Sequence, residues 1–329
     1  MGRGVIDIDV VIALIGAVIL IGLGSIFRHS FITSPEFWSG LEKLVYFVLL
    51  PALLVTGLAG ADFASIEPGP MVLVLTASAT FSALLAYAAR RPATGRDGPA
   101  FTSVFQGTVR FNTYIGVTTA AALFGSNGIA IAALANAVLI PFGNLASTIA
   151  LAHYGHHRLR GSALILAVFG NPLILACAVG LAANLIGSAP GMGDFLSAPV
   201  PAVVVQLIAA VLGLLGGAAL PIGLFCVGAG LRGRAFPRES LRPVAAALLL
   251  RFVPVPAATL GLCVLLGFSG PAAVVCVVFQ SLPTATSSYV FARRLGGDAA
   301  LMAQITAAQT VLSGVVLPAW ILIALTVLL

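Results

Sequence analysis

QGTVRFNTYIGVTT, residues 106–119, interrupts a run of apolar sequence that is long enough to cross a membrane. Arg110 lies about ten positions into the run, which at ~1.5 Å per residue is near the middle of a bilayer. A continuous helix facing lipid does not carry such a polar stretch with glycine at this depth. We therefore expect the helix to be broken here.

A second polar interruption, QSLPTATSSY at residues 280–289, lies in another apolar run. Pro283 removes one backbone hydrogen bond and crowds the preceding turn, so this helix is also expected to be broken. Irregular backbone at membrane depth is tolerated only where protein buries it or where it lines a cavity. Two matching breaks favour a binding site between the segments, and the alternative is a pair of kinks that serve packing alone.

The composition excludes a soluble protein. Of the 329 residues, 60% are hydrophobic and 8% are charged, and the mean hydropathy is +1.12. A soluble domain carries about 25% charged residues. The formal net charge of +6 is explained by basic residues on the cytoplasmic side of a membrane protein, so no nucleic-acid partner is expected. The sequence predicts an all-α polytopic membrane protein whose surroundings are the lipid bilayer.

Ten apolar blocks of bilayer length are predicted as membrane spans, at 8–27, 42–60, 70–89, 101–123, 127–152, 162–187, 202–231, 242–267, 271–292 and 300–328. With this count, 13 of the 16 Lys and Arg residues fall on one side of the membrane. Both termini are then predicted on the non-cytoplasmic side of the cell's inner (plasma) membrane.

Weak internal similarity suggests two inverted repeats of five spans each. Leu50-Pro51 is echoed by Leu220-Pro221, and Gly125 is echoed by Gly297 at nearly the same offset. The expected division is a first repeat at 1–152, a cytoplasmic connection at 153–161 and a second repeat at 162–329. A ligand site is expected at the interface between the two copies.

Two arginines are expected near mid-membrane, where a charge costs at least ~2.5 kcal/mol. Arg110 has two open explanations: it binds an anionic ligand beside the half-helix N-termini, or it caps carbonyls freed by the break. Arg251 precedes Pro254 and Pro256, which leave the carbonyls of Leu250 and Phe252 without helical partners. Capping those carbonyls is the favoured explanation of Arg251.

Acidic residues and histidines are absent from the middle of every predicted span. A proton relay through intramembrane carboxylates and a dedicated cation site are therefore not expected. The sequence also lacks paired intramembrane aspartates, an H-E-x-x-H motif, and a Ser with a His at bilayer depth. No catalytic residue, metal or cofactor is predicted, and the protein is not expected to be an enzyme.

The whole chain resembles the auxin efflux carrier family, within the bile/arsenite/riboflavin transporter superfamily. The resemblance rests on Asn112-Thr113 followed by Gly116, on the two Leu-Pro runs, and on Leu282-Pro283 followed by VFARRLGGD at residues 290–298. It implies that spans four and nine cross at a substrate site, with Asn112 and Pro283 at the crossover. It also implies a dimerising scaffold of spans 1, 2, 6 and 7 and a mobile transport unit of spans 3–5 and 8–10.

One position departs from the family pattern, because Phe111 precedes Asn112 where plant members have proline. The break in span four is then attributed to Gly116 and the polar run, and Arg110 suggests a substrate more acidic than auxin. The resemblance implies an elevator-type secondary transporter of a small organic anion, such as a mono- or dicarboxylate or an auxin-like acid, working as a homodimer. A membrane-embedded enzyme and a ligand-binding receptor or channel are the alternatives. The expected substrate-binding residues are Arg110, Asn112, Thr113, Gly116, Gln280, Pro283 and Thr284.

Overall fold

Helices make up all of the regular secondary structure in the part of the chain that the computed structural model describes, residues 8–61, 68–156, 172–189, 199–230 and 237–329. The elements of the first half are α1 (Ile8–Ile26), the π-helix η1 (Phe27–Phe31), α2 (Pro35–Leu44), the π-helix η2 (Val45–Leu49), α3 (Leu50–Ala59), α5 (Pro68–Ala88), α6 (Arg90–Thr94), α7 (Gly98–Val109) and α8 (Thr113–Tyr154). Those of the second half are α10 (Pro172–Gly187), α12 (Pro199–Ala229), α13 (Arg238–Phe252), α14 (Pro254–Leu265), α15 (Pro271–Gln280), α16 (Ser287–Leu295) and α17 (Ala299–Leu328).

Six helical runs among the described residues are long and apolar enough to cross a membrane: Pro35–Ala59, Pro68–Ala88, Gly98–Tyr154, Ala202–Ala229, Arg238–Leu265 and Ala299–Leu328. Three shorter apolar helices accompany them. The predicted spans 101–123 and 127–152 both lie in the run Gly98–Tyr154, and the non-helical backbone of Gly125 inside α8 separates them. The start of the predicted span 162–187 and the end of the predicted connection 153–161 lie outside the described residues. The all-helical membrane architecture is confirmed, while the count of ten spans and the inverted repeat stay predictions.

Both predicted breaks are present. The first separates α7 from α8 at residues 110–112, and the second separates α15 from α16 at residues 281–286. Gly116 does not make the first break, contrary to the expectation, because it lies within α8. A Cβ at this position would lie 2.7 Å from Leu282 Cδ1 and 3.1 Å from Phe279 Cζ. Its role is therefore the close approach of α8 to the second broken helix.

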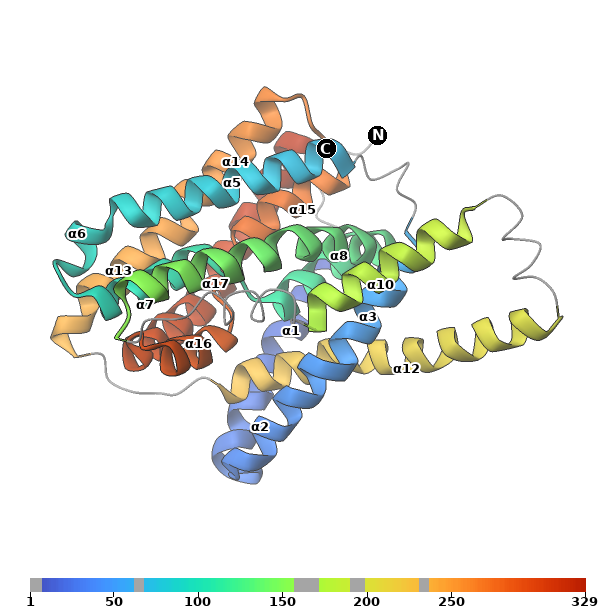
Figure 1. Cartoon of the computed structure of the whole chain (residues 1–329), viewed down its shortest axis with the longest axis horizontal. Coiled ribbons are helices and arrows are strands. Elements are labelled where there is room, and N and C mark those ends of the chain that lie inside the picture. Colours follow the sequence, from blue (N-terminus) through green and yellow to red (C-terminus); the bar gives the residue numbers. More distant parts are fainter. Residues whose placement is uncertain (1–7, 62–67, 157–171, 190–198, 231–236) are drawn as a thin grey trace.

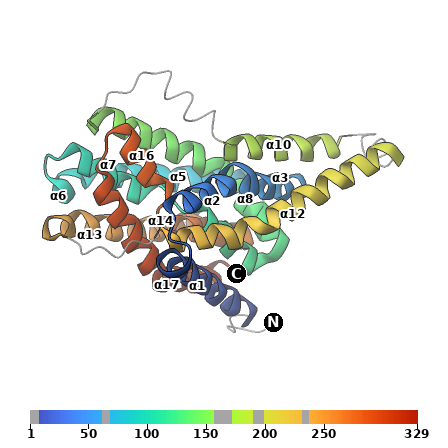
Figure 2. The same ribbon diagram turned by 90° about the horizontal axis from the view of Figure 1, so that it is seen from below.

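The helices form two groups that share α8 (Figure 1). In one group α1, α2, α3, α10 and α12 pack on one another, and α10 and α12 extend together beyond the rest of the molecule (Figure 2). In the other, α5, α7, α13, α14, α15, α16 and α17 pack together. Since α8 contacts both groups, the residues at its start lie where the groups meet. Which group moves stays a prediction.

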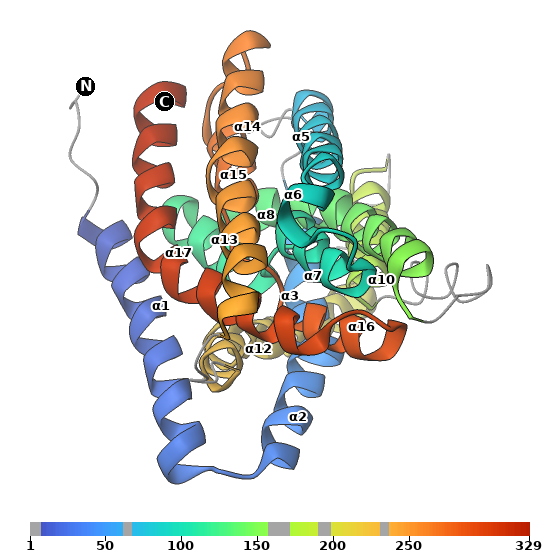
Figure 3. The same ribbon diagram turned by 90° about the vertical axis from the view of Figure 1, so that its left-hand side faces the viewer.

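Glycines permit the tight packing inside the first group. The helices α1 and α2 form the arms of an open V, and α12 passes between them (Figure 3). A Cβ on Gly24 would lie 2.2 Å from the carbonyl oxygen of Phe225, and one on Gly228 would lie 1.8 Å from that of Ile21. In a bilayer, where lipid is as apolar as the helices, such backbone contact drives helix association.

Candidate functional site

The break after α7 frees carbonyls that would otherwise accept hydrogen bonds from the next turn, and distant side chains satisfy them. The carbonyl of Gln106 accepts a bond from Thr284 Oγ1 at 3.2 Å, in addition to one from the backbone. Gln309 Nε2 donates to the carbonyl of Gly107 at 2.9 Å. Arg251 Nη1 donates to the carbonyl of Thr108 at 3.0 Å. The unwound backbone is thus fixed by partners from three other segments, as buried backbone requires.

The break after α15 is fixed in the same way. Residue 283 is proline and has no N–H, so the carbonyl of Phe279 loses its helical donor. Arg251 Nη2 supplies the missing bond at 2.9 Å, and Arg251 Nε donates to the carbonyl of Leu282 at 2.7 Å. The carbonyl of Pro283 accepts a bond from the backbone N–H of Asn112 at 2.8 Å. This bond joins the two breaks directly.

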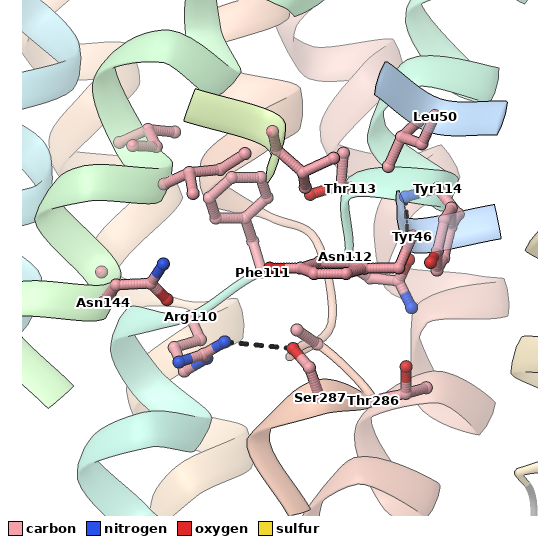
Figure 4. A pocket seen from close by; sticks show the side chains of 15 residues that line it. Tyr46, Leu50, Arg110, Phe111, Asn112, Thr113, Tyr114, Asn144, Thr286 and Ser287 are labelled. Carbon is pink, nitrogen blue, oxygen red and sulfur yellow. Dashed lines mark hydrogen bonds between the residues drawn. The ribbon is translucent and has the colours of Figure 1, made fainter. Parts of the chain in front are cut away.

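A cavity of about 70 Å³ opens at this junction (Figure 4). Since one buried water needs roughly 10–15 Å³ by the same measure, the cavity has room for a few waters or a small polar group. Side chains from both broken helices and from both helix groups surround it. The lining residues are Tyr46, Leu50, Arg110, Phe111, Asn112, Thr113, Tyr114, Leu139, Ile140, Gly143, Asn144, Leu173, Ala285, Thr286 and Ser287.

Asn112 caps the start of α8 and keeps one polar group free. Its Oδ1 accepts hydrogen bonds from the backbone N–H groups of Tyr114 at 3.0 Å and Ile115 at 3.2 Å. Its Nδ2 is buried and has no hydrogen-bond partner in the described part of the chain. An unpaired buried amide costs about 1–3 kcal/mol, so a ligand oxygen at Nδ2 would be bound favourably.

Arg110 carries the charge of the site. Its side chain is 8% exposed, and Nη2 donates to Ser287 Oγ at 3.0 Å (Figure 4). Its Cζ lies 4.1 Å from the ring centre of Phe291. Nη1 is buried, and no residue that the structure describes forms a hydrogen bond with it. Among the described residues, no carboxylate forms an ion pair with Arg110. The guanidinium therefore keeps a donor and its charge for a group that enters the cavity.

Two helices begin at the cavity wall. Thr113 and Tyr114 are the first residues of α8, and Ser287 is the first residue of α16. The start of α16 has no side-chain cap. Helix N-termini carry a partial positive charge, so both favour an anion in the cavity.

The residues predicted for the site divide into two places. Arg110, Asn112 and Thr113 line the cavity, whereas Gly116, Gln280, Pro283 and Thr284 lie outside its lining. Gln280 donates to Ser78 Oγ at 2.9 Å, and Thr284 bonds to Gln106 and Gln309. Sequence reasoning missed Tyr46, whose stretch gives no polar signal, and it also missed Asn144. Ser287 was visible in the quoted polar stretch but was not selected.

Arg251 caps carbonyls, as predicted, but the predicted carbonyls are the wrong ones. Its bonds go to the two broken helices rather than to Leu250 and Phe252. The carbonyl of Phe252 accepts a bond from Trp320 Nε1 at 2.8 Å instead. The described residues contain no group of three or more His, Cys, Asp or Glu side chains arranged to hold a metal ion.

Comparison with known proteins agrees with this architecture. Residues 156–321 match the family described as membrane transport protein. The chain is also 26% identical, over 310 residues, to an uncharacterized transporter of Methanothermobacter thermautotrophicus, with 93% of this chain and 95% of that protein covered. The chain therefore belongs to the membrane transport protein family, the auxin efflux carrier family of transporters.

Proposed function

We propose that this transporter moves a small organic anion, a mono- or dicarboxylate or an auxin-like acid. The observation that carries the proposal is Arg110, a buried cation with an unpartnered Nη1 at the wall of a cavity. A mid-membrane charge costs at least ~2.5 kcal/mol, and a buried cation without a counter-ion is costly. An anion bound in the cavity supplies both the counter-ion and the missing hydrogen bond.

The rest of the lining supports a small carboxylate. The Nδ2 of Asn112 is a second unpartnered donor on the same wall, and α16 begins there without a cap. Leu50, Leu139 and Ile140 supply apolar side chains to the lining. Such a wall suits a short carbon skeleton, while the donors suit the carboxylate that it bears.

The proposed mechanism is an elevator-type movement of α5–α8 and α13–α17 against α1–α3, α10 and α12. The position of the cavity supports this, because its lining comes from Tyr46 and Leu50 of one group and from Arg110 and Ser287 of the other. A sliding movement at this junction carries the bound anion with Arg110. We further propose that the protein works as a homodimer through α1–α3, α10 and α12 in the inner (plasma) membrane.

Exchange in proteoliposomes tests the function. Purified protein is reconstituted with an unlabelled carboxylate inside, and uptake of the labelled acid is measured across a panel of short mono- and dicarboxylates and their neutral amides. We expect saturable counterflow for acids and none for amides. Ser188→Ala, at an exposed position after α10, is the matched control and should exchange normally. A flux that does not saturate would indicate a channel, and equal uptake of amides would contradict an anion site.

A further inference from the structure

The most heavily bonded side chain of the crossover is a cation. Arg251 is fully buried near the end of α13. Four oxygen atoms accept its hydrogen bonds: the carbonyls of Leu282, Thr108 and Phe279, and Oε1 of Gln280 at 3.4 Å. None of these acceptors carries a formal charge. The guanidinium is therefore surrounded by neutral oxygens, which is the environment of a cation site rather than of an ion pair.

The acceptors belong to places where negative partial charge accumulates. Thr108 is the penultimate residue of α7, and Phe279 is the penultimate residue of α15. The C-terminal ends of half-helices carry the negative pole of the helix dipole, and in carriers with broken helices such ends and unwound carbonyls coordinate coupling cations such as Na⁺. In this chain the C-terminal ends of α7 and α15 both direct carbonyls at the guanidinium of Arg251, which lies where a coupling cation would bind.

We propose that Arg251 is a built-in cation that occupies the position of a coupling ion at the crossover. The positive charge is covalently attached, so it is present whether or not an ion gradient exists. The site is complete without an ion from solution, and wild-type transport is expected to need neither Na⁺ nor Li⁺. Arg251 thus positions both breaks, and through them Asn112 and Arg110, without touching the cavity.

Removing the side chain should leave an open cation site. Truncation to alanine deletes the donors but keeps the carbonyls of Thr108, Phe279 and Leu282 in place. A soluble guanidinium ion has the shape and charge of the missing group. We therefore expect low-millimolar guanidinium to bind R251A and to restore part of its stability.

Thermal melting of purified, substrate-free protein tests this directly. Choline is the background salt, and guanidinium, Na⁺ or Li⁺ replaces it at constant ionic strength. R251A should melt below the wild type, and guanidinium should raise its Tm saturably, by roughly 2 °C at a tenfold excess over the dissociation constant. Trp320→Phe is the matched control, because it also removes a buried donor to a freed carbonyl but leaves no cation site. Its Tm should fall and should not respond to guanidinium.

Two outcomes would overturn the assignment. One is that guanidinium raises the Tm of R251A no more than it raises the Tm of Trp320→Phe. The other is that Na⁺ raises the Tm of the wild type saturably. The wild-type titration decides the matter if R251A cannot be purified in folded form. The rate of carboxylate exchange should be the same with choline on both sides of the vesicle as with Na⁺. This transport measurement is the one part of the test that rests on the proposed function. A protein that moves no carboxylate at all would contradict that function, whereas the melting results need no substrate.

Discussion

Arg110→Gln separates a ligand-binding arginine from a structural one. The substitution keeps a polar side chain and removes the charge and the unpartnered Nη1. A hydrogen bond to a charged group contributes about 1.5–3 kcal/mol, so the dissociation constant for a transported carboxylate should rise roughly ten- to hundredfold. The neutral amide of the same acid should show no such difference.

The structure also sets the expected effect on stability. The ligand-free protein loses the bond from Nη2 to Ser287 and the contact with Phe291, worth about 1 kcal/mol each. The substitution also removes a buried charge, which costs at least ~2.5 kcal/mol in the wild-type protein. The free energy of unfolding should therefore not decrease, and the ligand-free Tm should not fall.

The assay pairs calorimetric titration of the best carboxylate with a melting curve in its absence. Ser287→Ala is the matched control, because it removes the partner of Nη2 and keeps the charge, so affinity should change little. An unchanged dissociation constant together with a lowered Tm for Arg110→Gln would show that the arginine only supports the backbone, and would refute the anion site.

Three further substitutions test other parts of the structure. Asn112→Ala should abolish exchange and cost about 1 kcal/mol of stability through the lost cap of α8, and normal transport would contradict its place in the site. Gly116→Val should destabilise the protein by about 1–3 kcal/mol, seen as a lower Tm, because its Cβ would lie 2.7 Å from Leu282; an unchanged Tm would contradict that close approach. Ser188→Cys, exposed after α10, should react with an impermeant thiol reagent added outside intact cells, and labelling only after membrane disruption would reverse the proposed orientation.

Local chemistry made the breaks predictable. A proline at 283 and a polar run around Arg110 are incompatible with continuous helices in lipid, so their positions could be derived from the sequence alone. Gly116 was misassigned because glycine is consistent with a break and also with close packing, and the sequence does not distinguish the two. The boundary that the sequence predicts between residues 123 and 127 coincides with the non-helical Gly125, where φ is +60°.

Long-range partners were not predictable in the same way. Gln309 bonds to Gly107 and Thr284, and Gln280 bonds to Ser78, across large separations in the chain. Each of these amides could equally have joined neighbouring helices at many other places. The freed carbonyls near Arg251 were inferred from the nearest prolines, whereas the fold brings Arg251 to the carbonyl of Phe279, which Pro283 frees in a different segment.

The contrast between the two arginines gives a physical criterion for their roles. A guanidinium has five donors, and burial is tolerated to the extent that these find acceptors. Arg251 directs all three of its nitrogens at oxygens of the crossover, so no donor nitrogen is left for a ligand. Arg110 leaves Nη1 unsatisfied although its side chain is almost as deeply buried. Three backbone carbonyls accept hydrogen bonds from Arg251, whereas Nη1 of Arg110 lacks an acceptor among the described residues beside a cavity. This difference supports the proposal that the charge of Arg110 serves an anion that binds and leaves.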